Sequence, residues 1–194
     1  MNRFYRLFLA VCLFFALTEF TAARTELGID VLQENNFDLI KGKKFLLFTN
    51  QSGRNTDGKL TAQVLKDQKE GEMIGIMAPE HGFWGAVPAG EKVNSEQFQG
   101  IQVHSLYGVS KSPNNSILSK ADVVLIDIQD IGIRSYTYIS SMLNVLKTAA
   151  KTNKPVIVLD RPNPLGGLAV DGNVVVPGME SFVGSMPISY IHGC

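Results

Sequence analysis

Two carboxylates that could carry acid–base chemistry stand at the ends of apolar runs in this sequence. Glu80, in Pro79-Glu80-His81-Gly82, follows one run, and Asp127 ends another. Glutamate is a poor turn former and gives no cap at a strand end, whereas aspartate there is often a cap or a turn former. His81 can tune the proton affinity of Glu80 or hold its orientation. The motif therefore predicts a catalytic centre at Glu80.

Other polar residues follow the remaining apolar runs or lie just beyond them. The set that we expect at one edge of the fold is Asn50, Gln51, Glu80, His81, Asp127, Gln129, Asp130, Arg134, Tyr136, Tyr138, Asp160, Arg161 and Asn163. The carboxyl ends of parallel strands point the same way, and ligands bind in the crevice outside them. Each residue alone also has a structural interpretation, and Asp160 with Arg161 could be an ion pair under a loop.

This edge would suit a polar, hydrogen-bonding ligand such as a sugar. A carboxyl group with a raised pKa can protonate a glycosidic oxygen, and a second carboxylate can act as base or nucleophile. The rings of Tyr107, Trp84, Tyr136 or Tyr138 could stack on a pyranose face. The composition of the edge therefore favours a glycosidase or a sugar-binding domain.

The elements that must position these residues read as alternating strands and helices. The nearly continuous apolar runs cover residues 44–50, 73–80, 121–127 and 155–160. Helical patterns cover residues 27–39, 60–66 and 138–151. Apolar runs of this kind are typical of strands buried on both faces, and the alternation predicts right-handed crossovers. We therefore predict an α/β fold with a doubly wound, mainly parallel sheet, a loop over 106–119, and turns with short strands after Pro162.

The first residues are expected to be a signal peptide, residues 1–23, rather than part of the fold. Arg3 and Arg6 precede the apolar run Leu7–Leu17, and small residues lie one and three positions before a cut after Ala23. The run is about half of the ~20 residues that span a bilayer, so a retained anchor is the lesser alternative. We expect an exported protein, periplasmic or extracellular, without stable membrane insertion after the signal is removed.

Composition and motifs also argue against several partners. Lys plus Arg and Asp plus Glu both number 18, so the formal net charge of zero provides no field to attract nucleic acid. The chain lacks the glycine-rich nucleotide motifs and the Gly-x-Ser-x-Gly elbow. His81, Asp127, Asp130 and His192 are metal-ligand types, but no His-x-x-x-His spacing supports a metal site. We therefore predict no cofactor and no metal.

Five motifs carry a family resemblance. They are Thr49–Gly53, Ala78–Gly82, Ser105–Gly108, Asp127–Tyr138 and Leu159–Gly167. In this order they resemble the exo-β-N-acetylmuramidase (NamZ-type) glycosidases, long catalogued as a domain of unknown function. The resemblance implies a Rossmann-like amino-terminal domain that carries the site, followed by a smaller domain. It also implies removal of N-acetylmuramic acid from the non-reducing end of peptidoglycan fragments, with muropeptides or muramyl disaccharides as substrates.

The resemblance implies roles for single residues as well. The catalytic glutamate of the family falls on Glu80, which we assign as general acid. Asp127 or Asp130 would be the partner carboxylate or would orient the sugar. The family's Arg-His-Gly-Met stretch is matched only around His192, which joins the substrate-binding set. Arg134 or Arg161 could pair with the lactyl carboxylate of muramic acid, because guanidinium forks suit carboxylates.

The length of the chain sets the domain prediction. Family members continue past the position of Cys194, so residues 24–194 are expected to be the catalytic-type domain of a truncated protein. Two alternatives to an active enzyme stay open at this point. One is a non-catalytic domain that binds cell-wall sugars, and the other is an inactive truncated fragment.

Overall fold

The structure is a computed structural model that describes residues 25–93, 96–108 and 110–193. Its strands are β1 (Lys44–Thr49), β2 (Glu72–Ala78), β3 (Glu96–Phe98), β4 (Ile101–Ser105), β5 (Val123–Asp127) and β6 (Val156–Val158). Its helices are α2 (Gly28–Glu34), α3 (Thr61–Asp67), α4 (Asn115–Leu118) and α5 (Tyr138–Lys151), with the 3-10 helix η1 (Asp38–Ile40). The expected signal peptide and Cys194 lie outside the described residues.

The strands form one sheet in the order β3-β4-β2-β1-β5-β6. Every neighbouring pair is parallel except β3 and β4, which form an antiparallel hairpin at one edge. From β1 the chain proceeds to β2 and β4 on one side, and later to β5 and β6 on the other. The strand order therefore reverses between β1 and β5, which is where ligand crevices form in open α/β sheets. The predicted fold class is confirmed.

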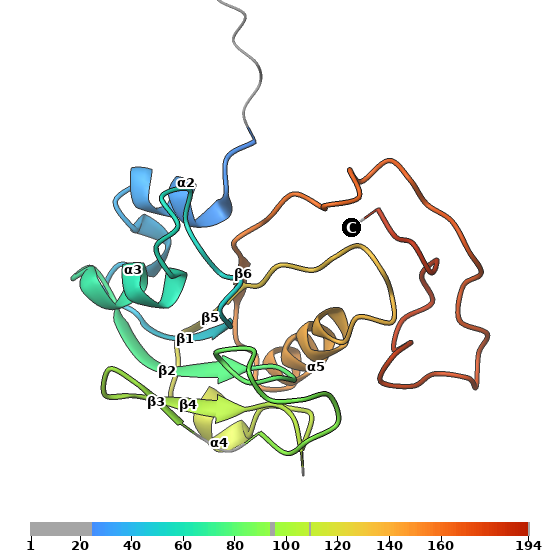
Figure 1. Ribbon diagram of the computed structural model, residues 1–194. Helices are drawn as coiled ribbons and strands as arrows, with labels where there is room; N and C mark the ends of the chain where they lie inside the picture. Colours follow the sequence, from blue (N-terminus) through green and yellow to red (C-terminus); the bar gives the residue numbers. More distant parts are fainter. Residues whose placement is uncertain (1–24, 94–95, 109, 194) are drawn as a thin grey trace, which may run out of the picture.

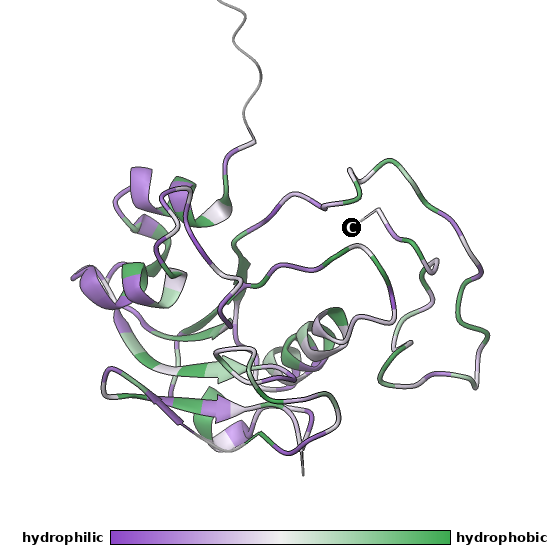
Figure 2. Ribbon diagram, in the orientation of Figure 1, coloured by the Kyte–Doolittle hydropathy of each residue, from purple (hydrophilic) through white to green (hydrophobic). Residues whose placement is uncertain are grey.

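Helices cover both faces of this sheet (Figure 1). In β1, Phe45 and Leu47 belong to the core cluster with α2 and α3, whereas Leu46 and Phe48 belong to the cluster with α4 and α5. Alternate side chains of a strand point to opposite faces, so a central strand must be apolar at every position. Figure 2 shows this hydropathy pattern, with hydrophobic residues along the strands and hydrophilic residues on the outer sides of α2 and α3.

The edge hairpin is the main element that the sequence pattern did not reveal. Gln99 and Gly100 join β3 to β4 with φ angles of 48° and 85°. Positive φ at both central residues is the geometry of a type I′ hairpin turn, which matches the twist of the flanking strands. Asparagine or aspartate before glycine usually marks this turn, so Gln99 gave a weak signal.

Two helical predictions differ from the structure at their boundaries. The helix expected over 27–39 ends at Glu34, because Asn36 and Phe37 adopt left-handed backbone with φ angles of 51° and 57°. Within the expected loop over 106–119, α4 forms one short turn, and the side chain of Asn114 caps it by accepting from Ser116 N at 2.9 Å. Both differences are local, and neither moves the strand ends.

Residues 159–193 contain no helix or strand but extend from the sheet edge as a long loop (Figure 1). The short strands expected there occur only as isolated bridges, such as Ile133 with Ile191. Nothing in the described part of the chain forms a helix of the length and apolarity needed to cross a bilayer.

Candidate active site

Glu80 lies just beyond the end of β2, and the residue is 7% exposed. Three groups from separate segments hydrogen-bond to its carboxylate. The Thr137 hydroxyl donates to Oε2 at 2.7 Å, Gly90 N donates to Oε1 at 3.2 Å, and the Tyr107 hydroxyl is the third donor. These donors are neutral, so the carboxylate is held by hydrogen bonds rather than by an ion pair.

Thr137 connects this carboxylate to helix α5. It occupies the N-cap position, where threonine usually accepts a hydrogen bond from the helix, but no such cap bond forms here. Its hydroxyl donates to Glu80 instead. The carboxylate therefore lies close to the amino-terminal end of α5, where the helix dipole favours negative charge.

The surroundings of Glu80 act on its proton affinity in opposite directions. Burial raises the pKa of Glu80, whereas the hydrogen bonds from Thr137, Gly90 and Tyr107 and the charge of His81 lower it. The net result is a pKa below the ordinary value of 4.5, so Glu80 is a carboxylate near neutral pH. Hydrogen bonding also raises the pKa of Tyr107, which stays a donor. The general-acid role of Glu80 requires a proton that this environment disfavours, and it stays a prediction.

His81 fixes the loop that follows. Its backbone is left-handed, with φ at 70°, a region in which histidine occurs more often than most residues. Its Nδ1 lies 2.8 Å from the carbonyl oxygen of Val87, which can only accept, so Nδ1 carries the hydrogen. The Val87 amide in turn donates to the His81 carbonyl at 3.2 Å. His81 therefore holds the loop that brings the Gly90 amide to Glu80.

Asp127 at the end of β5 is completely buried and has Arg161 as its partner. Arg161 donates through Nε to Oδ1 and through Nη2 to Oδ2, the latter at 3.0 Å, and the Thr61 hydroxyl also donates to Oδ2. Burial raises the pKa of Asp127, and Arg161 and Thr61 oppose this. The cluster ties β5 to the start of α3 and to the segment after β6, which favours a structural role for Asp127.

The structure also corrects the suggested ion pair between Asp160 and Arg161. Asp160 is exposed, and its Oδ1 accepts from the Arg161 backbone amide at 2.9 Å. The guanidinium points instead to Asp127, which lies 34 positions earlier in the chain. The side chains of neighbouring residues on an extended segment point in opposite directions. Arg161 therefore pairs with Asp127 at the end of β5 and not with the adjacent Asp160.

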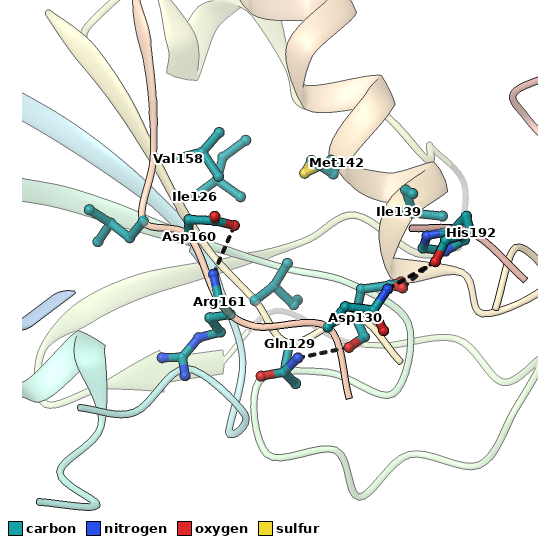
Figure 3. A pocket seen from close by; sticks show the side chains of 12 residues that line it. Ile126, Gln129, Asp130, Ile139, Met142, Val158, Asp160, Arg161 and His192 are labelled. Carbon is teal, nitrogen blue, oxygen red and sulfur yellow. Dashed lines mark hydrogen bonds and ion pairs between the residues drawn. The ribbon is translucent and has the colours of Figure 1, made fainter. Parts of the chain in front are cut away.

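Asp130 and His192 lie together (Figure 3) and form a second polar group with Asn163. Asp130 Oδ1 accepts from Gly132 N at 2.7 Å and lies 3.2 Å from His192 Nε2, without the geometry of a hydrogen bond. His192 is 2% exposed, and Asn163 Nδ2 donates to its carbonyl at 2.9 Å. Burial raises the pKa of Asp130. This group therefore joins the end of β5 to the last described residues of the chain.

A cavity of about 160 Å³ adjoins this group. Its apolar wall comes from the sheet and from α5 and includes Ile126, Ile139, Met142 and Val158, while Asp130 and His192 lie at its polar end (Figure 3). Gln129 also lines it, and its amide nitrogen donates to the Asp130 carbonyl at 2.8 Å and to the Pro162 carbonyl at 3.1 Å.

The residues after β1 form a third group with two tyrosines. Asn50 is 1% exposed, and its Oδ1 accepts from Ser52 N at 2.9 Å. The rings of Tyr136 and Tyr138 pack together with their centroids 4.4 Å apart. Burial is the main reason why the pKa of Tyr138 is raised. Asn50 follows β1, the strand that lies between β2 and β5 in the sheet.

Arg134 hydrogen-bonds to the long loop of residues 159–193. Its Nη1 donates to the carbonyls of Asn173 at 2.5 Å and Ile188 at 2.6 Å, and its guanidinium carbon lies 5.6 Å from the centroid of the Tyr190 ring. Both arginines predicted to bind a lactyl carboxylate are thus engaged within the protein.

Sequence reasoning missed Thr137 and Gly90 as partners of Glu80. Thr137 precedes a helix and resembles an ordinary N-cap, and Gly90 resembles a turn residue. Tyr107 was predicted only as a stacking ring, and its hydroxyl contact with Glu80 depends on packing between β4 and β2. No local sequence signal could have identified these contacts.

Comparisons with known proteins identify relatives of this chain. The model of the N-terminal domain of the exo-β-N-acetylmuramidase NamZ matches residues 45–194. The peptidoglycan β-N-acetylmuramidase NamZ of Bacillus subtilis (strain 168) is 38% identical over 172 residues, which cover 88% of this chain and 42% of that protein.

Two solved structures of DUF1343 family proteins from Bacteroides fragilis NCTC 9343 are also similar. The first has a TM-score of 0.80 and 42% sequence identity, and the match covers 87% of this chain and 42% of the solved chain. The second has a TM-score of 0.71 and 30% sequence identity, and the match covers 87% of this chain and 43% of the solved chain. The chain therefore spans less than half the length of the relatives that it matches.

Proposed function

The chain belongs to the NamZ N-terminal domain family, and from this premise we propose that it carries the catalytic face of a peptidoglycan glycosidase. The proposed reaction releases N-acetylmuramic acid from the non-reducing end of muropeptides or muramyl disaccharides. The observation that carries the proposal is the buried Glu80 carboxylate, held by Thr137, Gly90 and Tyr107 at the carboxyl edge of the sheet. A relative that is 38% identical is named as a peptidoglycan β-N-acetylmuramidase, which supports the substrate class.

Glu80 acts in this proposal as a carboxylate. Glycoside hydrolysis passes through a transition state with positive charge on the sugar ring, which a nearby carboxylate stabilises or attacks. An ionised carboxylate can also take a proton from the attacking water. The neutral donors around Glu80 favour these roles, because they keep it charged and fixed in one orientation.

A second carboxyl group must then donate a proton to the leaving oxygen. Asp130 is the candidate, because burial raises its pKa whereas the pKa of Glu80 is lowered. Two carboxyl groups whose environments push their pKa values apart are the usual basis for assigning acid and base. The cavity beside Asp130 gives a substrate group room to approach.

The test is hydrolysis of a chromogenic N-acetylmuramide by the purified chain. Glu80→Gln should abolish release, and Glu34→Gln, at the exposed end of α2, is the control that makes the same chemical change away from the edge. Binding of the sugar without release would indicate the alternative of a non-catalytic binding domain. Release that survives Glu80→Gln would contradict the proposed role of this residue.

The proposed site of action is outside the cytoplasmic membrane, since residues 1–23 have the pattern of a signal peptide. Amino-terminal sequencing of the exported protein would test this, with Arg24 expected as the first residue of the mature chain. A terminus at Met1 in the mature protein would contradict it.

A further inference from the structure

The anionic part of the proposed substrate needs a cation near Glu80, and neither predicted arginine provides one. The Arg161 side chain is 8% exposed and paired with Asp127. Arg134 donates to two carbonyl groups of the long loop. A substrate carboxylate would have to displace these contacts, which would leave Asp127 or the two carbonyl groups without a hydrogen-bond partner.

Lys111 is differently placed. Its ammonium group lies 4.0 Å from the centroid of the Phe182 ring and 5.6 Å from that of Tyr107. The centroids of the two rings are 5.9 Å apart, so Tyr107 and Phe182, from distant segments of the chain, together form an aromatic corner that contacts the ammonium group. Within the described residues, Lys111 makes no salt bridge. Aromatic faces attract an ammonium group but do not use its hydrogen-bond donors, which stay available to an anion.

Hydrogen bonds to helix α5 hold the two segments that form this corner. Asn144 on α5 donates through Nδ2 to the Lys111 carbonyl at 2.9 Å. On the other side, the Ser185 hydroxyl lies 2.8 Å from that of Ser140, which fixes the segment carrying Phe182 to the same helix. Both sides of the corner are therefore anchored to α5, whose N-cap residue Thr137 also holds Glu80.

Tyr107 places the corner next to the catalytic carboxylate. Its hydroxyl hydrogen-bonds with Glu80, and its ring lies against Lys111 and Phe182. A single tyrosine thus separates the Glu80 carboxylate from the Lys111 ammonium group. A sugar whose reacting carbon lies at Glu80 would extend its ring substituents toward this cation.

We propose that Lys111, together with Tyr107 and Phe182, forms the subsite for a carboxylate-bearing ether substituent of the substrate sugar. The carboxylate pairs with the Lys111 ammonium, and the apolar part of the substituent packs against the aromatic rings. Such a corner selects sugars with this substituent over otherwise identical sugars with a free hydroxyl group. The inference rests on the proposed function, because it specifies which sugar the Glu80 site accepts.

The experiment measures binding of three small ligands to the full chain by titration calorimetry: N-acetylmuramic acid, its methyl ester, and N-acetylglucosamine. Lys111→Met should weaken binding of the acid by about fivefold to tenfold, since a charge-assisted hydrogen bond is lost. Binding of the ester and of N-acetylglucosamine should stay unchanged. Lys111→Arg should restore the preference for the acid, and Phe182→Leu should reduce it by a smaller factor.

Lys69→Met is the matched control, because Lys69 is exposed after α3 and the substitution makes the same change in charge. An unaltered acid-to-ester ratio in Lys111→Met would overturn the subsite. The two proposals can fail separately in this design. Preferential binding of the acid without any hydrolysis would contradict the proposed activity alone, and hydrolysis without that preference would contradict the subsite alone.

Discussion

Asp127 and Glu80 lie at the carboxyl ends of the two strands that flank β1, and both are buried. Asp127 is contacted by the Arg161 guanidinium, whereas the donors to Glu80 are two hydroxyl groups and a backbone amide. The Arg161 guanidinium neutralises the net charge of the pair that it forms with Asp127, and it links β5 to the segment after β6. Neutral donors stabilise the charge but leave it available to a reacting group, so the donors distinguish the two sites better than burial does.

The largest effect is expected at Glu80, where a substitution tests whether this carboxylate is catalytic rather than structural. Glu80→Gln should lower the rate of muramide hydrolysis by about 10²–10⁴-fold, the range for loss of a catalytic acid or base. Stability should fall less than in Asp127→Asn, because an amide oxygen can still accept from Thr137 and no buried guanidinium is left unpaired. Rates come from the chromogenic assay and stability from a thermal melt, and a large loss of stability would show that Glu80 is a structural residue like Asp127.

The reverse pattern is expected for Asp127→Asn. Removing one partner of a buried ion pair leaves Arg161 uncompensated, which costs about 3–5 kcal/mol of unfolding free energy. Urea denaturation measures this loss. Asp57→Asn, at an exposed turn, is the control. If the variant were as stable as the unmodified chain but inactive, Asp127 would belong to the catalytic group after all.

Thr137→Val should change the pH dependence of activity, because Thr137 donates to Glu80 and not to Asp127. It removes a donor to Oε2, so the lowered pKa of Glu80 should rise and the acidic limb of kcat/KM should move to higher pH. The same shift applies to stability. With its pKa lowered by folding, Glu80 contributes stability that is present above its ordinary pKa and lost as the pH falls through the folded value. Thr152→Val, at the other end of α5, should leave the pH profile unchanged.

A smaller effect is expected on the basic limb of the profile. Burial raises the pKa of Asp130, so a proton donor at this position should lose activity as the pH rises through that raised value. Asp130→Asn should remove the basic limb and lower the rate, while Asp38→Asn, at an exposed carboxyl in η1 outside the site, should do neither. An intact basic limb in Asp130→Asn would assign the proton donor to another group.

Much of the fold followed from the sequence because its signals are local. A strand buried on both faces must be apolar throughout, so β1, β2 and β5 were identified from composition. The edge strand β6 was identified by its apolar run, although the structure leaves it partly exposed. Helix α5 was predicted with the bounds that the structure shows, since its apolar stripe repeats with the helical period. The β3–β4 hairpin escaped because its turn has glutamine where asparagine or aspartate is usual.

The site was predictable as a place but not as a set of contacts. The rule that parallel strands end at one edge brought Glu80, Asp127 and Asp130 to the same side of the sheet. It could not distinguish a carboxylate with a cation from one with neutral donors. Arg161 was expected to pair with its neighbour or with a ligand, and it contacts Asp127 instead.

The sequence by itself determined the family, the doubly wound sheet and the position of Glu80 at the end of a strand, because each depends on residues close together in the chain. Only the tertiary structure decided what surrounds that glutamate. Thr137 reaches it from 57 positions away, and Gly90 reaches it through a loop that His81 holds in place. Contacts of this length depend on how strands and helices pack, and no local pattern encodes them.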